Sequence, residues 1–333
     1  MSVPAWHSNP LTTMIMKKNV LLYMVAVAGL VLAGCNKTDA PEAGSLNMTV
    51  KASIGTLTRV SYDGASSAFE KGDKFSVYAW TGDAGTVPAK KVVDGVVNTL
   101  GEDGKWYPEI QMLWKTIVDP HYFIGIYPAR KVNDFKADTY VQLPLDYEAS
   151  DLLIATNVSG VKASDGAVAL DFDHAMAKLQ VHLNFRSQWN DTWGPVPGKE
   201  AVEVAVKART AGTVDYLSKT ISAAAAAEIA ALPLPALATA AAGYTYSYSN
   251  LIIPQEDVTE IDVTIGGKVY VYNHSGKDGI SLEKGKVTSI GLIVGREQLD
   301  LGGITVEDWA EGTTYPEDGE AMEEEKPSGV IPT

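Results

Sequence analysis

Cys35 is the only cysteine of the chain, so it provides the only thiol for nucleophilic attack, metal binding or covalent modification. It directly follows Gly34, which in turn follows an apolar run at residues 20–33. A thiol in this position can be a small buried side chain, a reactive group or the attachment point of a lipid. The segment that precedes it decides between these interpretations.

The apolar run before Cys35 is typical of a secretory signal. It is shorter than the roughly 20 apolar residues of a transmembrane helix, and Lys17 and Lys18 precede it. The sequence LAGC at residues 32–35 resembles the bacterial lipobox, whose cysteine receives a diacylglycerol and becomes the new N-terminus after cleavage. We therefore predict a leader and lipoprotein signal peptide at residues 1–35 and a diacylglycerol anchor on Cys35. A small buried thiol is the alternative.

The other polar residues form no recognisable catalytic pattern. The chain contains no GxSxG elbow, HExxH pair, Walker loop or dinucleotide fingerprint. The histidines beyond the leader do not have the spacing of a ligand pair on one helix; they are His121, His174, His182 and His274. We interpret His174 as a hydrogen-bonded structural residue at a strand junction and His182 as an exposed or interface residue. The chain is predicted to be neither an enzyme nor a metal protein, with no cofactor besides the acyl anchor.

Aromatic side chains offer a different chemistry, which is the stacking of sugar rings. The candidates are Trp106, Tyr107, Trp114, Trp189 and Trp193. Hydrolysis of a glycan would also need paired carboxylates across a cleft, and the sequence identifies no such pair. We expect Trp106 and Trp114 to pack beside the first β-sandwich, and QWNDTWGPVPG at residues 188–198 to be a loop with partly exposed indoles. Binding of a glycan through this loop is a second functional hypothesis.

Charge and cysteine content exclude several classes of protein. The formal net charge is −14, and acidic residues concentrate near the C-terminus. Such a surface repels phosphate, so nucleic acid is not an expected partner. Residues 310–333 are interpreted as an acidic, solvated tail. No disulfide can form within the chain, so its stability must come from apolar burial.

Strand patterns dominate from residue 46 onward. In LNMTVKASI, apolar and polar residues alternate with a period of two; the apolar set is Leu46, Met48, Val50, Ala52 and Ile54. About a dozen further short apolar runs, separated by Gly, Asp, Asn or Pro, favour antiparallel β-sandwiches. The alanine-rich stretch ISAAAAAEIAALPLP is the exception, and we expect a short helix at about residues 222–232.

Several segments together carry a family resemblance. They are AFEKGDKFSVYAW, LWKTIVDPHYFIGIYP, DLLIAT, VALDFDHAMAKLQVHL, LIIPQEDVTEIDVTI, LEKGKVTSIGLIV and GGITVEDW. Over most of residues 68–309 the chain thereby resembles the fimbrillin family of Bacteroidales, the Mfa-like pilus subunits. The resemblance implies two tandem transthyretin-like antiparallel β-sandwich domains, export as a lipoprotein, trimming by a trypsin-like protease and assembly with other pilus subunits by donor-strand exchange.

These observations predict an organisation of the mature chain. It comprises a pro-segment at 36–59, an N-terminal sandwich at 60–174, a C-terminal sandwich at 175–309 and the tail at 310–333. Arg59 is the predicted processing site, because it lies in a Gly-, Ser- and Thr-rich connection that a protease can reach. The strand before it, with Leu46, Met48, Val50, Ala52 and Ile54, then becomes a removable strand.

The predicted function is a structural subunit of a cell-surface pilus that supports adhesion, delivered as an outer-membrane lipoprotein. The alternative is an anchored surface lipoprotein or a tip adhesin that binds a glycan or a host ligand. The sequence pattern does not identify the strand that this subunit would donate, because the C-terminal tail is acidic and lacks an alternation of apolar and polar residues. Short donor candidates are GVIPT at residues 329–333 and LDLGGITV at 299–306.

Overall fold

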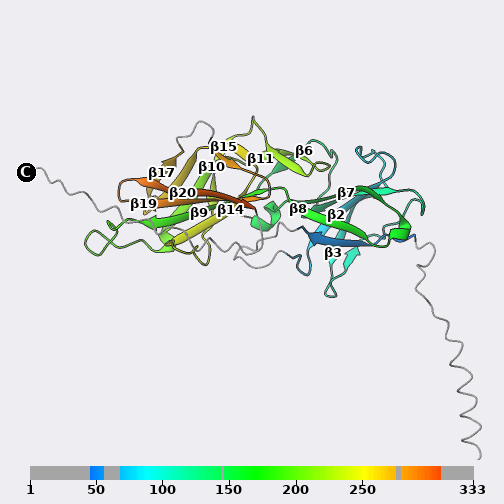
Figure 1. Cartoon of the computed structure of the whole chain (residues 1–333), viewed down its shortest axis with the longest axis horizontal. Coiled ribbons are helices and arrows are strands. Elements are labelled where there is room, and N and C mark those ends of the chain that lie inside the picture. The colour runs from blue at the N-terminus through cyan, green and yellow to red at the C-terminus, as the bar shows by residue number, and fades with distance from the viewer. Residues whose placement is uncertain (1–45, 56–67, 144–145, 275–278, 309–333) are drawn as a thin grey trace, which may run out of the picture. The chain divides into compact units, whose positions relative to one another are not determined.

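The structure is a computed structural model of the chain, and it describes residues 46–55, 68–143, 146–274 and 279–308. The predictions for Cys35, Arg59 and the acidic tail lie outside these residues. The described part belongs to one compact unit and consists almost entirely of β-strands (Figure 1). The predicted all-β, sandwich-type fold class is thereby confirmed. Within the described residues, no helix has the length and apolar character needed to cross a bilayer.

The first half of the described chain forms a seven-stranded sheet, which we call the acceptor sheet. In spatial order its strands are β1 (Val50–Ile54), β8 (Val168–His174), β7 (Leu153–Val161), β5 (His121–Tyr127), β2 (Lys74–Trp80), β3 (Val93–Leu100) and β4 (Trp106–Pro108). Only the pair of β1 and β8 is parallel, whereas all other neighbours in this sheet are antiparallel. The N-terminal strand β1 therefore lies at one edge of the sheet.

Both faces of the acceptor sheet are buried, and β2 illustrates why. Its residues Phe75, Val77 and Ala79 belong to one core cluster, whereas Tyr78 and Trp80 belong to another. Because successive side chains of a strand point to opposite faces, an almost continuous apolar run is required here. The sequence of β2 predicts this arrangement, and the structure confirms it.

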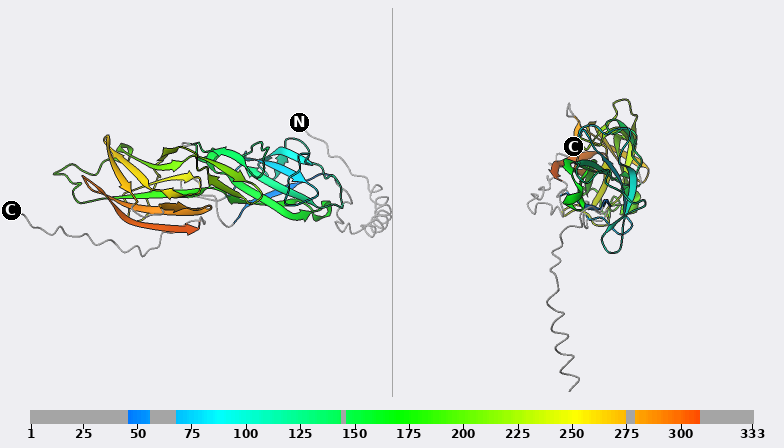
Figure 2. Two further views of the ribbon diagram at one scale, coloured as in Figure 1. Left: turned by 90° about the horizontal axis from the view of Figure 1, so that it is seen from above. Right: turned by 90° about the vertical axis from the view of Figure 1, so that its right-hand side faces the viewer.

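The second half of the described chain forms a two-layered sandwich, which we call the second sandwich. One sheet contains, in order, β14 (Tyr246–Ile252), β9 (Ala177–Phe185), β19 (Lys286–Val294) and β20 (Leu299–Asp308). The facing sheet contains β13 (Ile229–Leu234), β10 (Val202–Arg209), β16 (Glu260–Ile265) and β17 (Lys268–Asn273). In the left view of Figure 2, the orange strands along the lower side are β19 and β20 of the first of these sheets.

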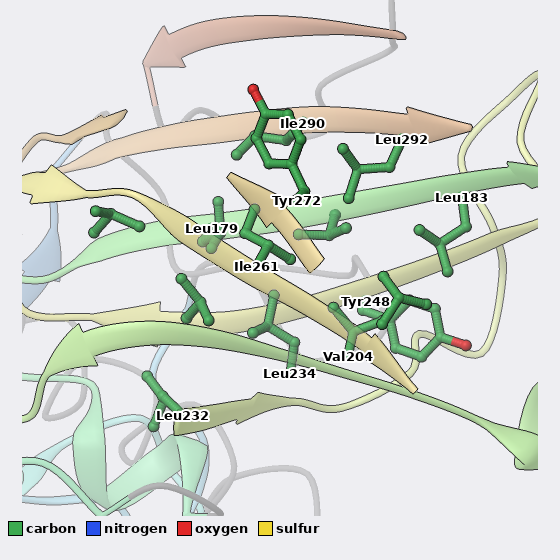
Figure 3. Close-up of a cluster of buried hydrophobic side chains, with 14 of the residues drawn as sticks. Leu179, Leu183, Val204, Leu232, Leu234, Tyr248, Ile261, Tyr272, Ile290 and Leu292 are labelled. Atoms are coloured by element: carbon green, nitrogen blue, oxygen red, sulfur yellow. The ribbon is translucent and has the colours of Figure 1, made fainter. Parts of the chain in front are cut away.

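Apolar side chains from both layers fill the second sandwich. Figure 3 shows Leu179 and Ile290 from one sheet together with Val204 and Ile261 from the other. All four are at most 2% exposed. Each fully buried aliphatic side chain of this size contributes roughly 1.5–3 kcal/mol, so this core provides the burial that a protein without disulfides requires.

Smaller elements complete the described fold. A three-stranded sheet contains β12 (Thr220–Ala223), β11 (Ala211–Asp215) and β6 (Asp138–Val141), and a two-stranded sheet contains β15 (Gln255–Val258) and β18 (Ile280–Leu282). The helical turns are α2 (Tyr147–Ser150), η1 (Ala163–Asp165) and η2 (Lys199–Ala201). A core cluster containing Ile124 and Ile154 of the acceptor sheet also includes Val214 of β11 and Leu251 of β14.

The helix predicted at residues 222–232 is wrong. This stretch contributes to β12 and β13, and β13 pairs with β10 in antiparallel register. Leu232 and Leu234 are buried in the second sandwich, and this tertiary burial outweighs the small helix preference of alanine. Pro233 is tolerated because β13 is an edge strand of its sheet. On such a strand, a residue without an N–H group need not remove a hydrogen bond between neighbouring strands.

Candidate strand-acceptor groove

The edge position of β1 is the feature that bears on the predicted exchange of strands. Its ladder with β8 runs in parallel register from Val50 opposite Val168 to Ile54 opposite Phe172. Backbone hydrogen bonds close both ends of this ladder: Val168 N donates to Thr49 O at 2.8 Å, and Gly55 N donates to Phe172 O at 2.9 Å. β1 is thus held along one side by a regular strand.

The other side of the segment is paired only at its start. Met48 N donates to Met112 O at 2.9 Å, and Trp114 N donates to Leu46 O at 2.8 Å. From Val50 onward, β8 is the only strand that pairs with β1 in the described residues. In the described residues, both sides of this segment are therefore paired only at its beginning.

The side chains of residues 48–54, which include β1, follow the predicted alternation. Met48 is 1% exposed and Val50 is 7% exposed, and both belong to the core cluster on one face of the acceptor sheet. Ala52 and Ile54 are half-buried and pack against the same cluster. Leu46 is 50% exposed, so its predicted burial is wrong, because the buried row begins only at Met48.

The core beneath β1 is lined by aromatic and aliphatic side chains. Phe172 of β8 packs edge-on against Phe69 and Phe75, with ring centroids 5.4 and 5.1 Å away. A methyl group added to Gly125 would lie 2.7 Å from Cζ of Phe172, so the glycine makes room for this ring. Without β1, the groove between β8 and the segment around Met112 would be apolar and bordered by an unpaired backbone edge.

The outward face of β1 is polar and is attached by few contacts. Thr49, Lys51 and Ser53 are exposed or nearly so, and the Ser53 hydroxyl donates to the Asp171 carboxylate on the neighbouring strand. An exposed contact of this kind adds little to stability. The hold on β1 therefore comes mainly from the row that begins at Met48 and from the backbone ladder with β8.

The covalent connection from β1 to the rest of the sheet runs through residues 56–67, which include Arg59 and lie outside the described residues. The remaining arginines of the chain are all anchored within the described fold. The backbone N of Arg130 donates to Ser76 Oγ at 2.9 Å, and guanidinium groups donate hydrogen bonds from Arg186, Arg209 and Arg296.

The histidines have structural surroundings. His174 is buried, and its Nδ1 lies 2.8 Å from Oδ1 of Asp151, so the predicted hydrogen-bonded role is confirmed. His182 is not exposed, contrary to the prediction. Its Nδ1 lies 2.7 Å from Ser247 Oγ, its ring packs near Tyr244, and burial lowers the pKa of His182 to about 4. Within the described ranges, no group of three or more metal-ligating side chains is found.

The aromatic candidates separate into core residues and surface residues. Trp114 is buried and Trp106 is half-buried in the core of the acceptor sheet, as expected. Tyr107 is 53% exposed. In the loop after β9, Trp189 packs against the core of the second sandwich, whereas Trp193 is 72% exposed. The prediction of a loop with partly exposed indoles is confirmed.

The candidate donor LDLGGITV lies within β20, where it pairs with β19 at the edge of the second sandwich. The apolar side chains of Leu301, Ile304 and Val306 on this strand are 45%, 36% and 47% exposed. They lie opposite Leu292, Ile290 and Thr288 of β19, which are buried. β20 thus presents an apolar row at an open edge. The other candidate, GVIPT, lies outside the described residues.

The described fold is thus an all-β arrangement of several sheets, with an N-terminal edge strand that packs on an apolar core cluster. The fimbrillin-like family model matches residues 58–309, so the chain belongs to the fimbrillin-like family. No curated protein matches it.

Solved structures of similar fold include two proteins from Bacteroides species. A cell adhesion protein candidate from Bacteroides uniformis is 16% identical over 79% of this chain and 98% of its own, with a TM-score of 0.59. A second such candidate, from Bacteroides ovatus, is 16% identical over 79% of this chain and 97% of its own, with a TM-score of 0.58. At these identities the comparison establishes a common fold.

Proposed function

We propose that this protein is a structural subunit of a cell-surface pilus and that β1 is a temporary strand, exchanged for a strand of another subunit during assembly. The family membership supports the pilus, and the single observation that supports the exchange is the placement of β1. It is an N-terminal edge strand with a buried apolar row, and the connection that follows it contains Arg59.

The strength of the hold on β1 is compatible with such an exchange. Complete burial contributes about 1.5–3 kcal/mol for each of Met48 and Val50, and partial burial of Ala52 and Ile54 adds less, which gives about 5 kcal/mol in total. An intact chain keeps the strand in place, because the strand is covalently attached. After cleavage at Arg59 the strand is held only by these contacts and its ladder, and it can leave.

The vacated groove then takes up an extended segment by β-augmentation, in which backbone hydrogen bonds supply affinity and alternate side chains fill the apolar positions. A suitable donor presents large apolar residues at a period of two, as Met48, Val50, Ala52 and Ile54 do. In this chain β20 has an apolar row but is already paired with β19. A subunit that accepts a strand without donating one would stand at the end of a fibre.

Delivery to the surface is the second part of the proposal. Cys35 receives the diacylglycerol and attaches the precursor to the outer membrane, and a trypsin-like protease cuts after Arg59. Metabolic labelling with a fatty acid tests the anchor: label in the wild type and none in Cys35→Ala is the expected result. Equal labelling of the two proteins would contradict it.

The N-terminus of the protein extracted from surface fibres tests the processing step. We expect the assembled form to begin at Val60 and the membrane-anchored precursor to begin at Cys35. An assembled form that still contains β1 would refute strand exchange at this groove. An Arg59→Gln variant is the matched control and is expected to accumulate as the anchored precursor.

A further inference from the structure

One end of the second sandwich carries a cleft that strand exchange does not use. β9 and β19 are parallel neighbours, so the loops that follow them emerge side by side. Lys268, at the start of β17, reaches the same place, because its Nζ donates to Arg296 O at 2.6 Å. Between these connections lies a cleft of about 340 Å³, lined by Arg186, Gln188, Trp193, Arg296, Glu297 and Gln298.

The walls of the cleft are fixed by Arg296. Its Nε donates to Gln188 O at 3.1 Å, its Nη2 donates to Gly194 O, and its guanidinium lies 4.2 Å from the ring of Trp189. Gly194 has a φ of 104°, in the left-handed region that favours glycine, and an added Cβ would approach Nη2 to 3.0 Å. The loop after β9 is therefore shaped around this guanidinium.

Trp193 presents its indole to solvent from an ordered turn. The side-chain Oδ1 of Asn190 accepts hydrogen bonds from the backbone N of Thr192 at 2.9 Å and of Trp193 at 3.1 Å. The Trp193 side chain nevertheless remains exposed. The backbone of the turn is thus fixed, and the exposed indole that it carries offers an apolar face on which a ring can stack.

The charges around the cleft do not cancel. Arg186 pairs with Asp300 at 2.6 Å, and Lys268 pairs with Glu297 at 3.1 Å. Arg296, by contrast, has no carboxylate partner among the described residues, and its Nη1 donates to no acceptor there. On a chain with a formal net charge of −14, this guanidinium leaves a local positive charge beside an exposed indole.

We propose that this cleft binds an acidic sugar unit of a glycan, with the sugar ring stacked on Trp193 and its carboxylate bound to Arg296. The volume is at the lower end of ligand pockets and suits one or two sugar rings. The side-chain carbonyl of Gln298 and the exposed carboxylate of Glu297 can accept hydrogen bonds from sugar hydroxyls. A protein partner would need a far larger contact area, on the order of 800 Å² from each side.

Titration of the purified full chain with methyl glucuronide and N-acetylneuraminic acid, against methyl glucoside as the neutral probe, tests this assignment. Tryptophan fluorescence and calorimetry provide the readouts. We expect dissociation constants on the order of 1 mM for an acidic probe and at least tenfold weaker binding of the neutral one. Trp193→Ala should weaken binding at least tenfold, whereas Tyr107→Ala, which alters an exposed aromatic residue outside the cleft, should not.

Variants of Arg296 test the charge. Arg296→Gln should remove the preference for the acidic probes, and Arg296→Lys should retain part of it; thermal melting reports whether either change disturbs the fold. Equal binding of acidic and neutral glycosides by the wild type would overturn the acidic assignment. A lack of saturable binding, or unchanged binding by Trp193→Ala, would overturn the site itself. Because Trp193→Ala leaves β1 intact, fibre assembly by this variant separates the glycan site from the proposed strand exchange.

Discussion

Met48→Ala should loosen β1 without altering its backbone pairing. Met48 is 1% exposed and lies in the cluster that contains Trp114, Val168 and Leu170. Truncation of a buried methionine to alanine costs about 2–5 kcal/mol, and we expect about 3 kcal/mol here because an edge site can partly collapse. In the cleaved protein this loss weakens the hold on β1 by about 150-fold.

The assay follows the fragment that ends at Arg59. The soluble Cys35→Ser chain is cut with an arginine-specific protease, and the release of an N-terminally labelled fragment is measured over time. Lys51→Gln is the matched control, because Lys51 lies on the exposed face of the same strand. The expected result is much faster release from Met48→Ala than from Lys51→Gln. Equal release rates for the two variants would refute the claim that the buried side chains keep β1 in place.

Three further changes test the packing of the described fold. Burial lowers the pKa of His182 from 6.5 to about 4, so protonation favours the unfolded chain. The free energy of unfolding should therefore fall by about 2 kcal/mol from pH 7 to pH 5. In urea unfolding experiments, His182→Gln should not show this decrease of about 2 kcal/mol. Gly125→Ala forces a methyl group against Phe172 and should lower the free energy of unfolding by about 1–3 kcal/mol, whereas an unchanged denaturation midpoint would contradict the close contact. Leu46→Ser should change stability by less than about 0.5 kcal/mol, whereas Val50→Ser should cost more than about 2 kcal/mol; similar values for both would show that the buried row is misplaced.

Local alternation predicts much of this fold. The period of two in β1, and the opposite directions of Phe75 and Tyr78 in β2, follow from the sequence because strand geometry fixes them. The end of β5 at Tyr127 follows from the proline after it, which has no N–H group to donate. The strand-rich fold class is the sum of such local signals.

Contacts between distant segments explain why some predictions from the sequence are wrong. His182 does point away from Val181 and Leu183, but residues near Ser247 cover its side of the sheet, and no local pattern reveals this cover. The strand β13 replaces a predicted helix because its pairing with β10 is decided by tertiary burial. The cleft at Arg296 is lined by two loops far apart in sequence, which follow β9 and β19. The exposed indole of Trp193 could be predicted from the loop sequence, but the position of the Arg296 guanidinium beside it could not.

A reversible disulfide lock can test whether β1 must leave the sheet before the subunit enters a fibre. Ser53 and Asp171 lie opposite each other on β1 and β8, and their side chains are in contact, so Ser53→Cys with Asp171→Cys places two thiols within reach of a disulfide. The measurement is the fraction of this double variant that enters surface fibres in the producing bacterium, with and without reductant. We expect that the oxidised chain is cut at Arg59 but is excluded from fibres, and that reduction restores its entry. Entry of the oxidised chain with β1 still attached, at the level of the wild type, would contradict it.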